Sequence, residues 1–470
     1  MKHLSLIIAM LLTFGFAFAQ TKDYKGNSNL NNSKVNMKST NTNWAKTTKA
    51  YNELKNQISN NKDFSAALQA SLTAAQQKAK SELHSDLYHA LDNVFGGNGQ
   101  GWPTTPDAYL EYIEKYLILI PNELDGPDYP NAWRSDNTRN GYSQKVYDLL
   151  CQFYFLVDQP LPPSNSILQD YKNGNFVFAD WLRDFAIDWG EFLNTKESLP
   201  LRAMNSFRAD PMYNIPLYSD NSKNWETFNQ FFYREFNGAD KKGHTPVRPI
   251  AEPGNNNVIT SPADCTYKMM YHIDDEGNVL DIDGQPTSVK LKETHSVYTV
   301  SELLQNDQLA EAFNGGTFVH YFLSPFEYHR FHSPADGIVK ECKSVQGKVF
   351  LDVELASNGE FDAPDSSEGG YEFQQSRGVF IVDAGEPVGL VAAIPIGMAQ
   401  VSGVDMYTKL KGEKVEKGDE FGKFRFGGSD IILLFQKNPD LYLWKKDPAH
   451  KPIHFQFGQV SAYWDVTKQQ

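Results

Sequence analysis

The sequence predicts an α+β protein, with an all-α domain toward the N-terminus followed by a strand-rich domain of sandwich or barrel type. Three observations predict this class. Residues 63–195 are rich in Ala and Leu and carry apolar residues at helical spacing. After about residue 245, short β-branched and aromatic runs alternate with Gly, Pro, Asn and Asp. The 470 residues include 31 Phe, 23 Tyr and 8 Trp, which suits two or three packed domains and excludes disorder throughout.

The first residues have the pattern of an export signal. A basic start, MKH, precedes an apolar run at 4–16 that is short for a membrane span, and the AFA at 17–19 matches a signal-peptidase site. We therefore expect a signal peptide over 1–19 and an exported mature protein, periplasmic or secreted, that is soluble or peripheral. Residues 20–62 are rich in Asn, Lys, Ser and Thr, which predicts a polar, flexible leader.

The helical domain is predicted to span 63–195. Thr105 and Pro106 read as a capping residue and a first helical residue, and Pro121 ends that helix. Its apolar face is expected at Leu110, Ile113, Leu117 and Ile120. The other helices are expected over 63–94, 143–157 and 178–193, the last with a core stripe of Trp181, Phe185, Trp189 and Phe192.

A helix-containing bridge over 196–245 is expected to lead into the strand-rich domain, 246–470. The chain there has several short runs of strand type. These runs lie at 257–260, 318–322, 349–353, 379–382, 388–394 and 431–435.

The net charge limits the classes of binding partner, and the cysteine count limits the number of disulfides. The net charge of −14 argues against nucleic acid, which needs a basic face, and against docking on an anionic membrane by charge alone. Cys151, Cys265 and Cys342 are odd in number and far apart, which favours buried thiols and leaves a single disulfide open.

Three segments carry residues suited to chemistry. They are SPAD at 261–264, YHRFHSP at 328–334 and GGSD at 427–430. Singly, SPAD and GGS are typical of turns, and the two histidines of the H-x-x-H spacing lack a nearby third zinc ligand. GGSD also lacks the patterns of a phosphate loop and of a hydrolase elbow.

Together, these segments supply a complete reactive set. Ser429 is a nucleophile, His329 and His332 are bases, and Asp264 can orient a base. Two glycines before Ser429 permit unusual backbone angles and close approach. This serine could therefore attack its own preceding peptide bond.

These residues stand in an order that resembles the phosphatidylserine decarboxylase family. The resemblance covers about 224–437 and rests on several segments. They are TFNQFFYREF at 227–236, Arg248-Pro249-Ile250, SPAD, LSPFEYHRFHSPADG at 323–337, IPIGMAQVSGV at 394–404 and KGDEFGKFRFGGS at 417–429.

The resemblance implies a self-processing enzyme that depends on a pyruvoyl group. The chain would be cut between Gly428 and Ser429, with Ser429 becoming the covalent pyruvoyl cofactor and with no metal. Asp264 and His332 match the residues that activate the serine, and His329 matches the histidine of the decarboxylation step. The fragment 429–470 would remain as the partner of the larger piece. The substrate amine would form a Schiff base with the pyruvoyl group before carbon dioxide leaves.

Two positions depart from the family pattern. Asp430 stands where the family usually has Thr, and a carboxylate beside the ester could slow or redirect processing. Cys265 stands where the family usually has Gly. Neither change removes a group that the mechanism requires.

Three functions follow from the resemblance. The first is decarboxylation of phosphatidylserine to phosphatidylethanolamine, with peripheral membrane contact. The second is decarboxylation of free aromatic amino acids by a soluble exported enzyme. It is suggested by the acidic charge, the export signal and a helical domain similar to that of a soluble branch of the family. The third is a binding or scaffold protein that kept the fold and lost the processing.

Overall fold

The computed structural model describes most of the chain after residue 40. The described residues are 41–121, 145–219, 225–280, 284, 298–349, 351–363, 373–398, 403–438, 440–446 and 451–464. They fall within one compact unit, Thr40–Gln470, so the boundaries expected at 195 and 245 stay predictions. The signal peptide expected over 1–19 lies outside the described residues. In the ranges above, no helix combines the length and the apolar character that crossing a membrane requires.

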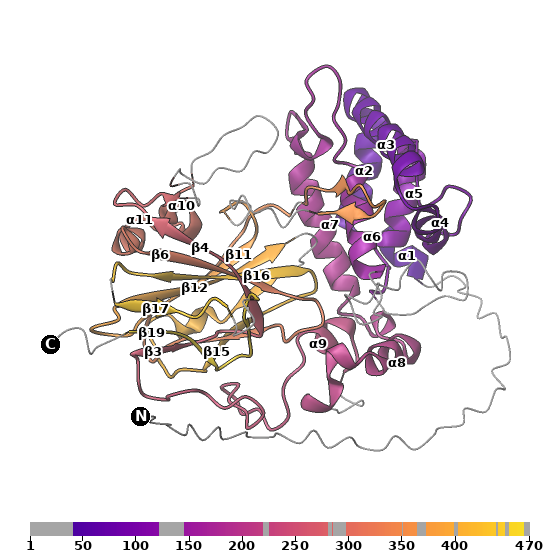
Figure 1. The fold of residues 1–470 in the computed structure, drawn as a ribbon. Coiled ribbons are helices and arrows are strands. Elements are labelled where there is room, and N and C mark those ends of the chain that lie inside the picture. The colour runs from indigo at the N-terminus through magenta and orange to yellow at the C-terminus, as the bar shows by residue number, and fades with distance from the viewer. Residues whose placement is uncertain are drawn as a thin grey trace, which may run out of the picture. The chain divides into compact units, whose positions relative to one another are not determined.

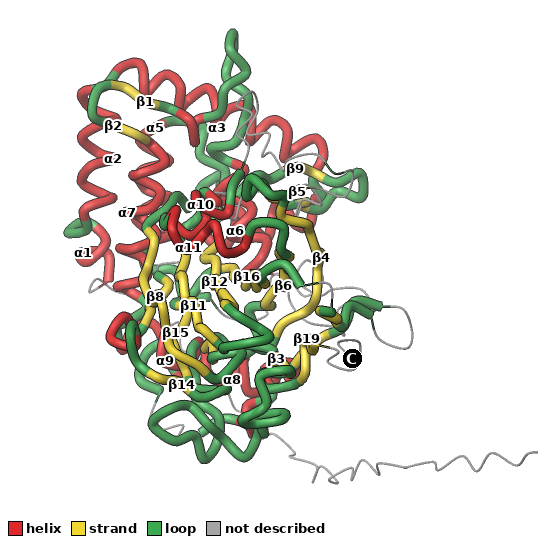
Figure 2. The backbone as a smooth tube through the Cα atoms, turned by 90° about the vertical axis from the view of Figure 1, so that its left-hand side faces the viewer, coloured by secondary structure: helices red, strands yellow, loops and turns green. Residues whose placement is uncertain are grey.

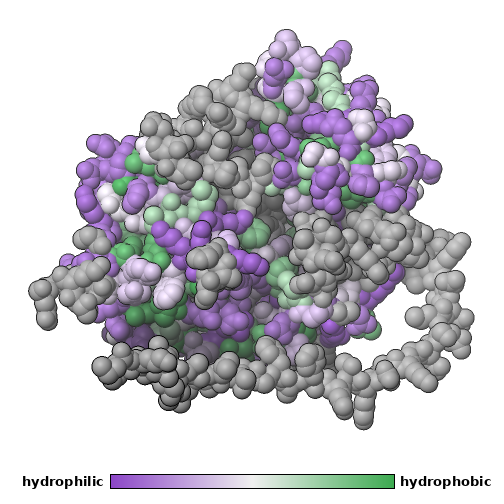
Figure 3. Space-filling view, viewed as in Figure 1, coloured by the Kyte–Doolittle hydropathy of each residue, from purple (hydrophilic) through white to green (hydrophobic). Residues whose placement is uncertain are grey.

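The N-terminal half is helical, and α2 packs against α3, α5 and α7 (Figures 1 and 2). The helices of the described chain are α1 Asn41–Ala45, α2 Lys49–Asn60, α3 Lys62–Glu82, α4 Ser85–Val94, α5 Pro106–Tyr116, α6 Lys145–Phe155, α7 Phe178–Phe192, α8 Leu201–Ala209, α9 Phe228–Phe232, α10 Val300–Leu304 and α11 Asp307–Ala310. On the face drawn in Figure 3, hydrophilic residues dominate the surface of this helical part.

The leader expected over 20–62 is wrong for its second half, because α1 and α2 occupy most of it. Thr48 caps α2 by accepting a hydrogen bond from the backbone N–H of Tyr51. Tyr51 and Leu54 are buried, and the Trp181 indole donates to the Ala50 carbonyl at 2.8 Å. Few apolar residues suffice here because they share one helical face and find partners on α7.

The helices predicted over 105–121, 143–157 and 178–193 are found with adjusted ends, and the one predicted over 63–94 is found as two helices. Thr105 caps α5 and Pro106 is its first residue. The buried face of α5 is mainly aromatic, with Tyr109, Tyr112, Ile113 and Tyr116, whereas the predicted face included the half-buried Leu110. The helix predicted over 63–94 is broken after Glu82, where the His84 N–H donates to the Gly359 carbonyl instead of continuing the helix. The predicted core stripe of α7 is buried as expected.

Antiparallel strands form the second half. The large sheet has the order β14-β8-β11-β12-β16-β6-β4-β18, with β5 paired to β4 (Figure 2). Three-stranded sheets β13-β15-β7 and β17-β19-β3 accompany it. The strands are β1 Lys172–Asn173, β2 Phe176–Val177, β3 Val258–Thr260, β4 Cys265–Ile273, β5 Val279–Leu280, β6 Thr317–Leu323, β7 Arg330–His332, β8 Gly337–Val345, β9 Glu354–Leu355, β10 Phe361–Asp362, β11 Arg377–Asp383, β12 Leu390–Met398, β13 Val404–Met406, β14 Lys414–Val415, β15 Glu420–Phe424, β16 Gly428–Phe435, β17 Leu441–Leu443, β18 His454–Phe455 and β19 Val460–Trp464.

Most of the predicted strands are found, but the one expected over 349–353 is not. Residues 349 and 351–353 are outside strands, and only the two-residue β9 follows them. The backbone of this segment turns to the helical part instead. The Val353 N–H donates to the Asp158 carboxylate, and the Leu351 carbonyl accepts from the Gln169 side chain.

Both faces of the large sheet are buried at its central strand, β16. Ile431, Leu433 and Phe435 of β16 pack into one hydrophobic cluster, and Ile432 and Leu434 pack into another. Successive side chains of a strand point to opposite faces, so the odd and even residues of β16 lie in separate cores. This alternation also decides where the side chains of Ser429 and Asp430, near the start of β16, point.

Candidate active site

Ser429 lies at the start of a central strand. β16 runs between β12 and β6, and Ser429 is opposite Gly397 on one side and Leu323 on the other. The side chain is fully buried, and its hydroxyl oxygen makes no hydrogen bond to any described residue. Gly427 has a φ of +152°, which L residues rarely adopt. A buried, unengaged hydroxyl directly after a glycine turn suits a serine that reacts with the peptide bond before it.

Asp430 points away from that hydroxyl. It occupies the even face of β16, whereas Ser429 occupies the odd face. One oxygen of the fully buried Asp430 carboxylate lies 3.0 Å from Nε2 of His320 on β6. The carboxylate that departs from the family pattern is therefore engaged in the opposite core of the sheet.

His332 is a buried, neutral base with a defined tautomer. Its Nδ1 lies 2.7 Å from the Gly418 carbonyl oxygen, so Nδ1 carries the hydrogen and donates it. Nε2 is then the basic nitrogen, and it accepts from the Tyr328 hydroxyl at 2.9 Å. Burial lowers the pKa of His332 to about 3. The ring is thus uncharged near neutral pH and able to take a proton through Nε2.

Asp264 does not hydrogen-bond to His332, although the sequence suggested a base with its orienter. One carboxylate oxygen accepts from the Arg248 guanidinium at 3.1 Å and the other from the Phe457 backbone N–H at 2.7 Å. The Phe457 ring stacks on the His332 ring, with centroids 3.7 Å apart. Asp264 therefore acts on the position of His332 through Phe457 in this uncut chain.

His329 lies in an aromatic setting next to the segment that precedes Ser429. Its ring stacks on Phe232 with centroids 3.8 Å apart, and its backbone carbonyl accepts from the Phe424 N–H at 2.9 Å. The side chain is fully buried, and burial lowers its pKa well below the usual value. None of the hydrogen bonds among the described residues joins Ser429 to Asp264, His329 or His332.

Sequence reasoning gave no role to three residues that hold these groups in place. Tyr328 and Arg248 stand inside the motifs YHRFHSP and RPI, so the motifs were the available signal. Phe457 stands outside every motif that the sequence singled out. Its contribution is a backbone N–H and a ring face, and composition or spacing does not reveal either of them.

The described residues include potential metal ligands and three cysteines besides the groups around Ser429. No group of three or more His, Cys, Asp and Glu residues there is arranged to hold a metal. Cys151, Cys265 and Cys342 are buried and unpaired with one another. Burial raises the pKa of the Cys265 thiol and raises that of Cys342 to about 12, so both stay protonated.

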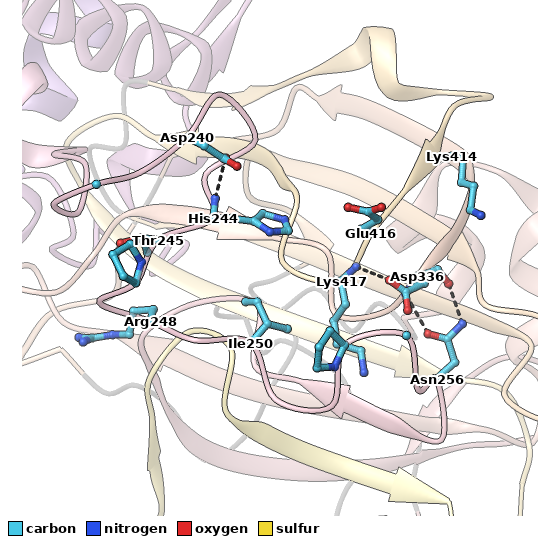
Figure 4. Close-up of a pocket in the computed structure, with 14 residues that line it drawn as sticks. Asp240, His244, Thr245, Arg248, Ile250, Asn256, Asp336, Lys414, Glu416 and Lys417 are labelled. Atoms are coloured by element: carbon cyan, nitrogen blue, oxygen red, sulfur yellow. Dashed lines mark hydrogen bonds between the residues drawn. The ribbon is translucent and has the colours of Figure 1, made fainter.

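A cleft of about 920 Å³ borders the site (Figure 4). Its lining residues are Gly238, Asp240, His244, Thr245, Pro246, Arg248, Ile250, Pro253, Gly254, Asn256, Asp336, Lys414, Glu416 and Lys417. Most of its charged groups are already engaged. The Lys417 ammonium donates to three backbone carbonyls, Asp336 accepts from the Lys417 backbone N–H, and His244 contacts Asp419. The cleft therefore offers few free charges for a ligand.

Comparisons with known proteins agree with the motifs. The family model described as phosphatidylserine decarboxylase matches residues 228–460. A phosphatidylserine decarboxylase proenzyme of Fusobacterium nucleatum is 31% identical over 258 residues, covering 54% of this chain and 75% of its own. A decarboxylase of Amanita muscaria is 27% identical over 288 residues, covering 55% and 77%.

An L-tryptophan decarboxylase of Psilocybe cubensis is 25% identical over 385 residues, covering 77% of this chain and 80% of its own. This match is longer than the whole strand-rich half, so it extends into the helical half as well. From the ordered motifs, the buried serine after two glycines and these similarities, we conclude that this chain is a decarboxylase that belongs to the phosphatidylserine decarboxylase family.

Proposed function

We propose that this protein cuts its own chain before Ser429 and uses the resulting pyruvoyl group to decarboxylate phosphatidylserine. The observation that carries the proposal is the state of Ser429. Its hydroxyl is buried and makes no hydrogen bond to a described residue, and it follows two glycines, the first of which has a positive φ. A structural serine in a core normally bonds a backbone carbonyl, as Ser198 does here.

The cut needs only residues of this chain and one water. The Ser429 hydroxyl oxygen attacks the Gly428 carbonyl carbon, the C–N bond breaks, and an ester with a free amine at residue 429 results. Loss of the α-proton of residue 429 then expels the Gly428 carboxylate and leaves a dehydroalanine. Water replaces its nitrogen, which leaves as ammonia. The chain ends as a larger piece finishing at Gly428 and the partner fragment 429–470.

His332 is proposed as the base for the first step. Its Nε2 lone pair is the basic site, because Nδ1 donates to the Gly418 carbonyl. Serine is a weak nucleophile until a base takes its proton, and a neutral imidazole is the form that can do so. Asp264 supports this step indirectly, through the Phe457 contacts described above.

For turnover, the pyruvoyl carbonyl would bind the substrate's amine and accept the electron pair left when carbon dioxide departs. His329 is proposed to hold the proton that the substrate carbon then receives. A histidine whose pKa is lowered by burial gives up an acquired proton readily. Its stacking on Phe232 fixes the ring orientation and excludes water from one of its faces.

A second substrate class, free aromatic amino acids, is favoured by one observation. The similarity to the L-tryptophan decarboxylase of Psilocybe cubensis covers 77% of this chain, whereas that to the Fusobacterium phosphatidylserine decarboxylase proenzyme covers 54%. The helical half is therefore shared with a relative whose name states an amino-acid substrate.

Intact-mass spectrometry tests the cut. Purified protein should give two species. One ends at Gly428, and the other spans 429–470 and is lighter, by the mass of ammonia, than the same fragment beginning with an intact serine. Ser429→Ala should give a single uncut chain. An uncut wild-type chain would leave a binding or scaffold role and would contradict the proposal.

Carbon dioxide release separates the substrates. The cut enzyme is given phosphatidylserine vesicles in one assay and free Trp, Tyr or Phe in another, with Ser429→Ala as the blank. Release from the vesicles supports the first substrate. Release only from the free amino acids would replace it with the second.

We also propose that the protein is exported. The basic start, the apolar run and the AFA at 17–19 support this localisation. Expressed in a bacterium with a periplasm, the larger piece recovered outside the cytoplasm should begin at Gln20. Retention in the cytoplasm with Met1 in place would contradict export.

A further inference from the structure

Asn229 ties the helical half to the segment that must be cut. It is the second residue of α9 and is fully buried. Its side-chain NH₂ donates to the Gly190 carbonyl at 3.1 Å and to the Asn194 side-chain oxygen at 2.9 Å, both next to the end of α7. Its side-chain oxygen accepts from the Phe426 backbone N–H at 3.2 Å. These partners fix which end of the Asn229 amide is the NH₂ group. The Gly190 carbonyl oxygen can only accept a hydrogen bond, and the Phe426 backbone N–H can only donate one.

The Phe426 ring is held by the same two helices. It packs edge-to-face against Trp189 of α7 at 5.3 Å and against Phe228 and Phe232 of α9 at 5.1 and 5.2 Å. The Phe232 ring also stacks on the His329 ring, with the two ring centroids 3.8 Å apart. One residue earlier, Arg425 pairs with Glu191 at 3.2 Å on the surface. The chain is therefore anchored in the helical half two residues before Gly428.

The scissile bond itself lies within the large sheet. From Gly428 onward the chain is part of β16, where Gly428 lies opposite Met398 and Ser429 opposite Gly397 and Leu323. Only Gly427 separates the two anchors, and glycine has the widest backbone freedom of any residue. Fixing Phe426 before Gly427 and Gly428 after it reduces the set of orientations that the Gly428 carbonyl can take toward Ser429.

We propose that the helical half is a built-in support for self-cleavage, and that Asn229 is the positioning residue through which it acts. This inference rests on the proposed cut before Ser429. It gives the helical half a function in maturation, independent of the substrate that the mature enzyme takes.

The test measures how fast newly synthesised chains are cut before Ser429. Wild type, Asn229→Ala, Asn229→Asp and Asn229→Ser are produced by cell-free translation, and the half-time for release of the fragment 429–470 is measured on gels. Asn229→Asp keeps an oxygen for Phe426 but places a second oxygen against the Gly190 carbonyl. Asn237→Ala is the matched control, because its exposed side chain donates to the Pro216 carbonyl at 2.8 Å, on the surface. We expect all three Asn229 variants to be at least ten-fold slower than wild type and the control to equal wild type.

Two further readouts separate positioning from folding. Each substitution is repeated in a Ser429→Ala background, where the melting temperature should stay within a few degrees of the parent. Hydroxylamine, which cleaves an ester already formed, should not restore cutting in the Asn229 variants, because the attack on Gly428 is the slowed step. Rapid cutting with hydroxylamine would place the defect after the ester and overturn the inference.

Every remaining outcome is also decisive. A wild-type half-time in any Asn229 variant that keeps its melting temperature overturns the inference. If none of the variants folds, Asn229 has a structural role and the inference is equally overturned. If wild type itself is never cut at Gly428, the proposed function fails first, and the Ser429→Ala chain will be indistinguishable from wild type.

Discussion

The carboxylate of Asp430 lies 3.0 Å from Nε2 of His320, in the core opposite to the one that the Ser429 side chain faces. The two residues are chain neighbours, yet the strand alternation separates their side chains. The Asp430 carboxylate, which directly follows Ser429 in the sequence, thus lies on the opposite face of the sheet from the serine side chain.

Asp430→Asn should therefore leave the cut almost unchanged and weaken the fold. The asparagine keeps the size of the side chain but replaces the buried oxygen that contacts His320, a loss of about 1–3 kcal/mol. The half-time of cutting should stay within about three-fold of wild type, while urea unfolding of the Ser429→Ala chain should show the loss. The surface pair of Lys437 and Asp275 provides the control, since Asp275→Asn should change neither quantity. A chain that folds but is no longer cut would show that Asp430 acts on the serine directly.

Tyr328→Phe should not slow the cut. The Tyr328 hydroxyl occupies Nε2 of His332, the nitrogen proposed to take the serine proton, while the Gly418 carbonyl keeps the ring oriented. Removing one hydroxyl costs about 1 kcal/mol of stability and frees the base. Gel time courses should show wild-type or faster cutting, and Tyr218→Phe, another buried tyrosine, serves as control. A ten-fold slower cut would instead make Tyr328 a proton relay between Ser429 and His332.

Arg248→Met should destabilise the chain strongly and slow the cut. The guanidinium pairs with the buried Asp264 carboxylate at 3.1 Å, and leaving one buried partner alone costs about 3–5 kcal/mol. Thermal unfolding measures the loss. Adding Asp264→Asn should recover part of the stability but not the cutting. Arg202→Met, on the exposed face of α8, should have no effect. Equal melting temperatures for Arg248→Met and wild type would contradict this account of the pair.

Stability should fall as the pH drops below about 6.5. Burial lowers the pKa of His332 to about 3 and that of His329 well below its usual value, so the folded chain keeps both neutral where the unfolded chain binds protons. Each such histidine then costs about 1.4 kcal/mol of unfolding free energy per pH unit below about 6.5. Urea unfolding of the Ser429→Ala chain at pH 7, 6 and 5 measures this slope. His332→Gln in that background should lower the slope by the share of one histidine, and an unchanged slope would show that His332 is protonated in the folded chain.

The sequence was most informative where one local rule decides the outcome. Thr105 and Pro106 mark the start of α5 because capping is a local hydrogen bond, and the stripe of α7 is buried because its spacing is helical. The leader was misjudged from its polar composition, since two well-placed apolar residues, Tyr51 and Leu54, secure α2. The break at His84 could not be foreseen, because its cause is a hydrogen bond to Gly359, far away in the chain.

In the candidate site, too, the sequence predicted the residue types but not the contacts between distant parts of the chain. Residue types and motif order pointed to Ser429, His332, His329 and Asp264, because their chemistry is visible in the sequence. The partner of Asp264 is Arg248, and its link to His332 is the backbone and ring of Phe457. Such contacts depend on which strands and loops meet in space, and spacing along the chain carries no information about them.

The proposed cut at the start of β16 would have a consequence for how long the mature protein stays folded. The fragment 429–470 carries nearly all of β16, which lies in the middle of the large sheet between β12 and β6. After the proposed cut, the backbone hydrogen bonds of β16 to these two strands would hold the fragment on the larger piece. Folding before the proposed cut would be an event within one chain. Once unfolded, the mature enzyme can re-form only when two separate chains meet, so its persistence depends on slow unfolding rather than on repeated refolding.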